Sequence, residues 1–82
     1  MHEMSVALEI ARIVDVKLGD SVRNLLTVAV DVGDDAGIEP SNLEFCLDAV
    51  FRTPPFSGVT PRIQRCSGDV LRVAYMEIDD GC

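Results

Sequence analysis

The stretch NLLTVAVDVG at residues 24–33 decides the fold, because its apolar residues recur at every second position. A period of two places successive side chains on opposite faces of a β-strand. The valines favour that conformation, and Gly33 is expected to end the strand. The alternation predicts two faces, with Leu26, Val28, Val30 and Val32 on one and Leu25, Thr27, Ala29 and Asp31 on the other.

The preceding segment, SVALEIARIVDVKL at residues 5–18, has the period of an amphipathic helix. Its apolar residues recur at spacings of three and four, which brings them to one side of a helix. We expect Ser5 to cap the helix and Gly19 to end it, with residues 20–23 as the connection to the strand. The predicted buried stripes contain Val6, Ala7, Ile10, Ala11, Ile13, Val14 and Leu18.

A polar loop at residues 34–39 should lead from the strand to a second helix. That helix is predicted from Pro40 or Ser41 to Phe51, since proline suits the first helical turn. Ser41 and Glu44 match the spacing of a capping box. Four residues should form its buried stripe: Leu43, Cys46, Leu47 and Val50.

The last third of the chain predicts two strands. The segment TPPFSGVTP (53–61) has three prolines and a glycine, so we expect irregular structure there. Residues 62–66 form a candidate short strand, and 67–69 suit a tight turn. Residues 70–79, VLRVAYMEID, alternate again, which favours a β-hairpin with the strand before them.

The predicted order is therefore α-β-α-β-β, within a single domain over residues 1–82. Two helices packed on one face of a three-stranded sheet is the simplest α/β (α+β) arrangement that buries both helical stripes. Such a sheet keeps two open edges, so a strand-exchanged homodimer is one alternative to a monomer.

Composition excludes several classes of partner. A net charge of −7 repels phosphate backbones and anionic lipid surfaces, so we expect neither nucleic acid nor a membrane as a partner. No run approaches the about 18 apolar residues of a membrane span. The three cysteines Cys46, Cys66 and Cys82 are odd in number and widely spaced, which favours a reducing compartment and hence the cytoplasm. Cys46 is expected in the core.

The sequence has few residues in arrangements typical of an enzyme active site. It has one histidine, at a chain end where a water-excluded pocket is hard to build. Its six glycines are scattered and form no phosphate-binding loop. The acidic pairs at 34–35 and 79–80 have no further ligand at fixed spacing, so we expect them to be solvated loop charges.

The chemistry lies in the opening tripeptide Met1-His2-Glu3. The free α-amine, the amide nitrogens of His2 and Glu3 and the His2 ring nitrogen can converge on one point. Four nitrogens in a plane suit Ni(II) or Cu(II) better than Zn(II). Because the backbone amides must lose protons, binding should strengthen as pH rises.

Three stretches resemble the HypA family of nickel-insertion accessory proteins: MHEMSVALEI at the start, VDVGDDAGIEPSNLEFCLDAV at 30–50 and GDVLRVAYMEID at 68–79. The resemblance implies a domain of two helices and a three-stranded mixed sheet. It also implies nickel binding through Met1, His2 and Glu3, and delivery to a nickel–iron hydrogenase. The partners it implies are the hydrogenase large subunit and a nickel-loading GTPase.

The chain departs from this family between its last two strands. Members carry an inserted zinc domain with two Cys-x-x-Cys pairs there, whereas this chain has only Cys66-Ser67-Gly68-Asp69 and no such pair. We therefore expect no structural zinc, in either a naturally shortened relative or a chain from which the insert was removed. The alternative function is a HypA-like interaction module that lacks metal delivery.

Overall fold

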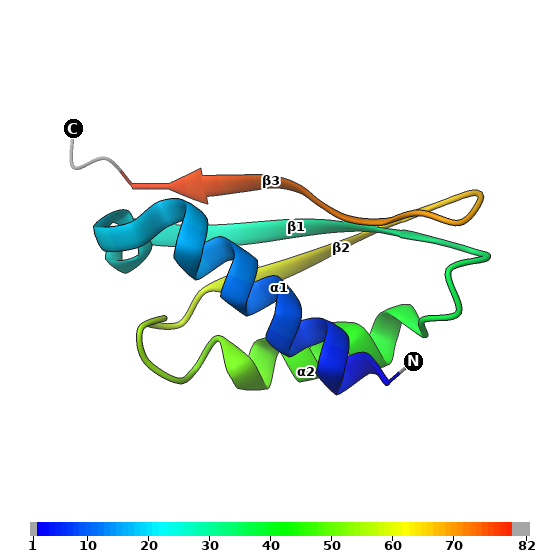
Figure 1. The fold of residues 1–82 in the computed structure, drawn as a ribbon, viewed down its shortest axis with the longest axis horizontal. Coiled ribbons are helices and arrows are strands. Elements are labelled where there is room, and N and C mark those ends of the chain that lie inside the picture. Colours follow the sequence, from blue (N-terminus) through cyan, green and yellow to red (C-terminus); the bar gives the residue numbers. More distant parts are fainter. Residues whose placement is uncertain (1, 80–82) are drawn as a thin grey trace.

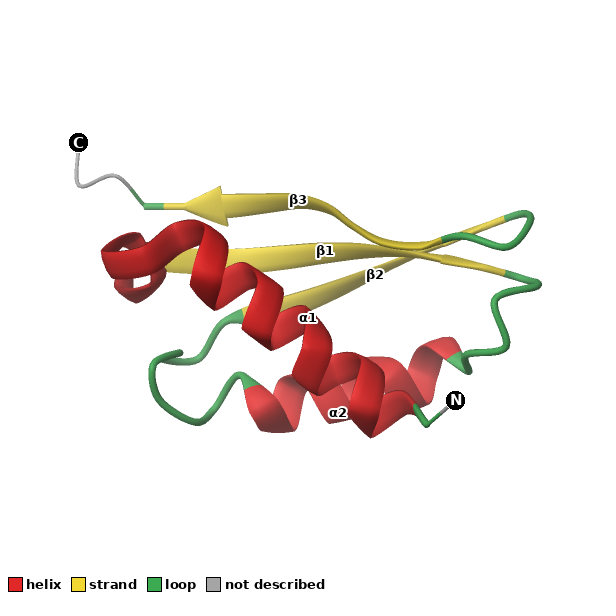
Figure 2. Cartoon of the chain, viewed as in Figure 1, coloured by secondary structure: helices red, strands yellow, loops and turns green. Residues whose placement is uncertain are grey.

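The computed structural model describes residues 2–79, which form a mixed three-stranded sheet with two α-helices on one side of it (Figures 1 and 2). The predicted α+β class is confirmed. The elements, in chain order, are α1 (Glu3–Leu18), the short 3-10 helix η1 (Gly19–Asn24), β1 (Leu25–Gly33), α2 (Pro40–Val50), β2 (Thr60–Cys66) and β3 (Leu71–Ile78).

The strand order is β2-β1-β3, so the expected hairpin between the last two strands is wrong. β1 lies in the middle, parallel to β2 and antiparallel to β3. The link of residues 67–70 therefore crosses the end of β1 instead of making a tight turn. Alternation in the sequence identified both strands, but it carries no information on which neighbour each strand takes. The central position satisfies the backbone groups on both edges of the most buried strand.

The crossing brings two backbones into close contact at Gly33. The Gly33 amide donates to the carbonyl of Val70 at 2.6 Å, and the Asp34 amide donates to the carbonyl of Cys66 at 2.8 Å. A Cβ on Gly33 would lie 2.7 Å from the nitrogen of Val70 and closer still to the carbonyl oxygen of Gly68. Gly33 is thus required for close approach of the link.

β1 is buried on both faces, with a bulge near its start. Val28, Val30 and Val32 share the helix side of the sheet as predicted, and each is at most 1% exposed. The pairing with β3 shifts between Leu25 and Thr27, so Leu26 is an extra residue. Leu25 consequently lies in the core, whereas Leu26 is 52% exposed, the reverse of the predicted assignment.

α1 begins at Glu3, two residues before the predicted start, with His2 as its N-cap. It ends at Gly19, whose positive φ of 55° matches the expected stop signal. The buried face contains five of the seven predicted residues: Val6, Ala7, Ile10, Ala11 and Val14. Ile13 is exposed instead and Leu18 is partly buried, because only one side of α1 meets the sheet and α2.

α2 begins at Pro40, and the predicted capping box is wrong. Glu39 is the N-cap, and its carboxylate accepts a hydrogen bond from the Asn42 amide at 2.5 Å, so Ser41 and Glu44 play no part. The helix buries Leu43, Cys46 and Leu47 as expected, while Val50 is only partly buried. No helix within residues 2–79 is both long and apolar enough to cross a membrane.

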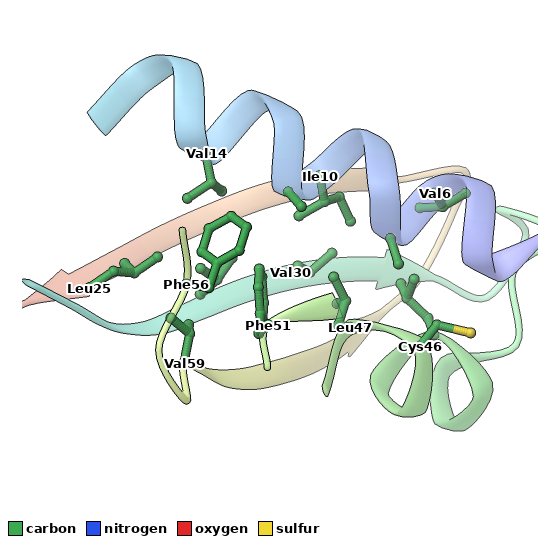
Figure 3. Close-up of a cluster of buried hydrophobic side chains, with 14 of the residues drawn as sticks. Val6, Ile10, Val14, Leu25, Val30, Cys46, Leu47, Phe51, Phe56 and Val59 are labelled. Atoms are coloured by element: carbon green, nitrogen blue, oxygen red, sulfur yellow. The ribbon is translucent and has the colours of Figure 1, made fainter. Parts of the chain in front are cut away.

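The core lies between the helices and the sheet, and Figure 3 shows its side chains meeting from both layers. Phe51, at the end of α2, contacts Phe56 edge to face with ring centres 5.0 Å apart. The proline-rich segment is irregular as far as Val59, but β2 starts at Thr60 and includes Pro61. Pro61 is tolerated because β2 is an edge strand, where a missing N–H need not break a ladder.

The crossing at Gly33 predicts a large cost for a single methyl group. We expect Gly33→Ala to lower the free energy of unfolding by about 2–3 kcal/mol, since backbone rather than a flexible side chain must move. Gly37→Ala is the matched control: it meets no atom but takes a left-handed φ of 76°, at a cost of about 1 kcal/mol. Urea unfolding of both variants measures the difference. Equal destabilisation would contradict the close crossing.

Candidate metal centre at the N-terminus

His2 lies at the first turn of α1 with its side chain exposed. Its backbone is extended, with φ −87° and ψ 139°, and its side chain makes no capping hydrogen bond. The imidazole is therefore accessible from solvent beside the backbone of the helix start. Met1, the third residue of the predicted site, lies outside the described residues.

The Glu3 carboxylate connects the beginnings of the two helices. One oxygen accepts a hydrogen bond from the Glu39 amide at 3.1 Å, and the other accepts from the Asn42 side-chain nitrogen at 2.8 Å. Figure 1 shows the N-terminal end of the chain beside the start of α2. This carboxylate thereby joins the start of α1, next to His2, to the start of α2.

These hydrogen bonds act on the charge of Glu3. The Glu39 amide, followed by the Asn42 side chain, holds the pKa of the Glu3 carboxyl below its ordinary value of 4.5. The positive ends of both helix dipoles favour the same ionised form. The same positive helix ends would repel a bound cation. The negative charges of Glu3 and Glu39 reduce that repulsion at this end of the molecule.

One backbone nitrogen at the helix start lies outside the helical ladder, although its own side-chain carboxylate accepts a hydrogen bond from it. The first helical hydrogen bond runs from the Val6 amide to the His2 carbonyl at 3.2 Å. The Glu3 amide therefore precedes the helical ladder and has no carbonyl one turn earlier to bind. Its use as a ligand nitrogen would leave the α1 ladder unbroken.

Within residues 2–79, the N-terminal region included, no group of three or more His, Cys, Asp or Glu side chains is placed to hold a metal ion. Cys46 is buried in the core as predicted, and Cys66 is a half-buried free thiol at the end of β2. Asp34 and Asp35 are exposed loop residues. Cys82 and Asp80 lie outside the described residues. Because the described side chains alone do not form a metal site, a site at the N-terminus would need main-chain nitrogen atoms as ligands in addition to side chains.

Sequence reasoning missed Glu39 and Asn42 as supports of this site. The usable signal was Glu39 directly before Pro40, because a polar residue ahead of a first-turn proline is placed to cap. The contact of Asn42 with Glu3 spans 39 residues and follows only from the packing of α1 against α2.

The lowered pKa of Glu3 predicts a pH-dependent contribution to stability. Because the folded-state pKa is depressed, this contribution is present above about pH 4.5 and is lost as pH falls through the folded-state value. Glu3→Gln, which keeps the shape, should be slightly less stable than the parent at pH 7, and the gap should close in acid. Chemical unfolding at several pH values measures this.

Asn42→Ala provides the cross-check. If the two side chains act together, Glu3→Gln should change stability less in the Asn42→Ala background than in the parent. Additive effects of the two substitutions would show that the carboxylate acts independently of Asn42.

Comparison with known proteins points to one family. No solved structure matched the chain. Three proteins named "Hydrogenase maturation factor HypA" are similar to it. The protein of Geobacter metallireducens is 34% identical over 68 residues, covering 83% of this chain and 60% of its own length. That of Albidiferax ferrireducens is 32% identical over 78 residues, covering 94% and 69%. That of Geotalea uraniireducens is 32% identical over 91 aligned residues, covering 100% and 81%.

The chain thus spans about 60–81% of the length of these relatives. The alignment with the Geotalea protein is longer than the 82-residue chain, so the relative has extra residues within the matched region. Residues 1–77 match the family described as "Hydrogenase/urease nickel incorporation, metallochaperone, hypA". That match covers nearly the whole sequence, and the chain belongs to the HypA family.

Proposed function

We propose that this chain is a nickel metallochaperone that binds Ni(II) at its N-terminal end and delivers it during maturation of a nickel–iron hydrogenase. The observation that carries the proposal is an exposed His2 at the N-cap of α1, next to an amide that precedes the helical ladder. Family membership supports nickel as the metal and hydrogenase maturation as the process. A metallochaperone transfers its cargo without catalysing a reaction, so we do not assign an enzyme activity.

The proposed ligands are the α-amine of Met1, the amide and ring nitrogens of His2, and the amide nitrogen of Glu3. Four nitrogens in a plane match the square-planar preference of Ni(II). Two deprotonated amides would neutralise the charge of the cation, which offsets the unfavourable helix dipoles. We assign the Glu3 carboxylate a positioning role, because its oxygens accept hydrogen bonds from Glu39 and Asn42.

The location of this site suits transient binding. Ligands that belong to the chain end can separate from the metal while the buried core of α1 and α2 stays intact. We propose the hydrogenase large subunit as the recipient and a nickel-loading GTPase as the partner in transfer. Cys46 and Cys66, which are free thiols within residues 2–79, fit a reducing cytoplasmic location.

The residues present do not fit a structural zinc site. A Cys-rich zinc site uses four ligands, commonly from paired Cys-x-x-Cys segments. Here the link from β2 to β3 offers Cys66 alone, and the sequence has no Cys-x-x-Cys pair. We propose that nickel binding in this chain proceeds without coupling to a zinc domain.

Nickel titration of the protein with its native Met1 tests the function. We expect one Ni(II) per chain, a visible absorption band typical of square-planar nickel, and affinity that rises with pH because amide protons are released. His2→Ala should remove the band and lower affinity by at least about 100-fold, since it removes one ligand of a chelate. Absorbance and calorimetry together provide the measurement.

Two controls locate the site. One added residue before Met1 moves the amine out of reach and should reduce binding as His2→Ala does. Asp35→Ala removes an exposed carboxylate from a nearby loop and should leave the titration unchanged. Equal nickel binding by the parent and His2→Ala would contradict the proposal. If both also bound the hydrogenase large subunit equally, the alternative of an interaction module would replace it.

A further inference from the structure

β3 forms one outer edge of the sheet, and its backbone groups alternate between β1 and solvent. Just before its start the Val70 carbonyl accepts from the Gly33 amide at 2.6 Å, and just past its end the Asp79 amide donates to the Asn24 carbonyl at 2.8 Å. Counting inward from these two points, residues 72 and 77 also face β1. The N–H and C=O groups of 71, 73, 76 and 78 therefore point away from the sheet.

A bulge in the middle of β3 sets which side chains share a face. Val30 pairs with Val73 while the adjacent Ala29 pairs with Tyr75, so Ala74 is an extra residue. Val73 and Met76 both pack against the core on the helix side. On the open side, the Arg72 guanidinium donates to Asp31 at 2.9 Å.

The same open side carries the Tyr75 hydroxyl, which accepts from Arg62 at 2.9 Å. The change of phase at Ala74 thus places Leu71, Val73, Met76 and Ile78 on the helix side, and Arg72, Tyr75 and Glu77 on the open side.

This pattern makes β3 complementary to an antiparallel copy of itself. In the register that places Leu71 opposite Ile78 of a second copy, Val73 lies opposite Met76, and both pairs are apolar and on the helix side. Both pairs also consist of residues whose backbone groups point outward, as hydrogen-bonded pairs require. Arg72 lies opposite Glu77 on the open side, twice by symmetry, with opposite charges.

The regular alternation of a strand would forbid this register. A two-fold axis perpendicular to a sheet keeps each side chain on its own face, whereas residues 71 and 78 of an unbulged strand would point to opposite faces. The extra residue at Ala74 reverses the side-chain alternation for the second half of the strand, so that residues 71 and 78 point to the same face. Bulges more often protect an edge from pairing, but this one brings the two halves of β3 into matching phase.

The β2 edge has no such complementarity. Pro61 lacks the N–H that a ladder needs, and the charged side chains of β2 are Arg62 and Arg65, which have the same sign. Charge and backbone thus distinguish the two edges.

From these observations we infer that the chain forms a homodimer through antiparallel pairing of two β3 edges, with strand order β2-β1-β3-β3-β1-β2. Both helix layers then lie on one side of a six-stranded sheet.

The inferred dimer also covers apolar surface on the helix side. A groove of about 450 Å³ runs between α1 and β3 and is lined by Ile10, Ile13, Leu71 and Val73 among others. Ile13 is 42% exposed, and Leu71 and Ile78 are 37% and 41% exposed. A second β3 places its own Leu71 and Ile78 beside these residues, which removes apolar area from water.

Sedimentation of the full chain over a wide concentration range tests the dimer. The mass should rise with concentration from 8.9 kDa toward twice that value. Glu77→Arg places an arginine opposite Arg72 of the second copy, and Arg72→Glu places a glutamate opposite its Glu77. Like charges then repel across the interface, so each variant should weaken association by about tenfold or more.

An equimolar mixture of these two variants should restore association, because each heterodimer regains two opposite-charge pairs. Glu44→Arg, the same charge change on an exposed position of α2, is the control and should dimerise at least as well as the parent.

Amide hydrogen exchange provides the site-resolved readout. The Val73 and Met76 amides should gain protection with concentration, whereas those of Arg72 and Glu77 should be protected throughout by pairing with β1. A concentration-independent mass of 8.9 kDa would overturn the inference. So would a dimer whose concentration-dependent protection lies in β2, or a mixture of the two charge variants that stays monomeric.

Discussion

The structure depends on the burial of β1 between two edge strands that run in opposite directions. A parallel neighbour and an antiparallel neighbour on either side of one strand cannot be joined by a tight turn, so the link after β2 must cross the end of β1. That crossing requires a residue without a side chain at Gly33 and ties the loop after β1 to the same link.

The same end of the molecule carries the proposed nickel site. The loop from Gly33 leads to Glu39 and Pro40, and the start of α2 then contacts Glu3 at the start of α1. The loop after β1 thus leads directly to the start of α2, and α2 in turn holds the start of α1. Of the proposed ligand residues, Glu3 is held against α2 by its hydrogen bonds and His2 is exposed. This asymmetry suits the proposed role, in which a metal ion is bound and then released.

Local sequence signals predicted the elements of this fold well and their connections poorly. Both helices and three strands follow from periodicity, and Gly19 and Pro40 mark ends that the structure confirms. The predicted hairpin between the last two strands was wrong. Alternation within one segment indicates a strand, but which strands become neighbours depends on how all three pack together. Leu25 and Leu26 were exchanged because a bulge shifts phase without a signal in residue type. His2 and Glu3 were found from their position in the chain, while Asn42 was not, because its contact exists only after packing.

The long reach of the sheet contacts has a consequence for how the chain folds. Thr27 pairs with Thr60, and Leu25 pairs with Ile78, so neither edge of β1 has a partner until most of the sequence is available. Folding is slow when its stabilising contacts join distant residues. During synthesis the valines of β1 would leave the ribosome well before the strands that cover their backbone. A nascent chain with such a segment exposed depends on chaperones or rapid completion to avoid aggregation.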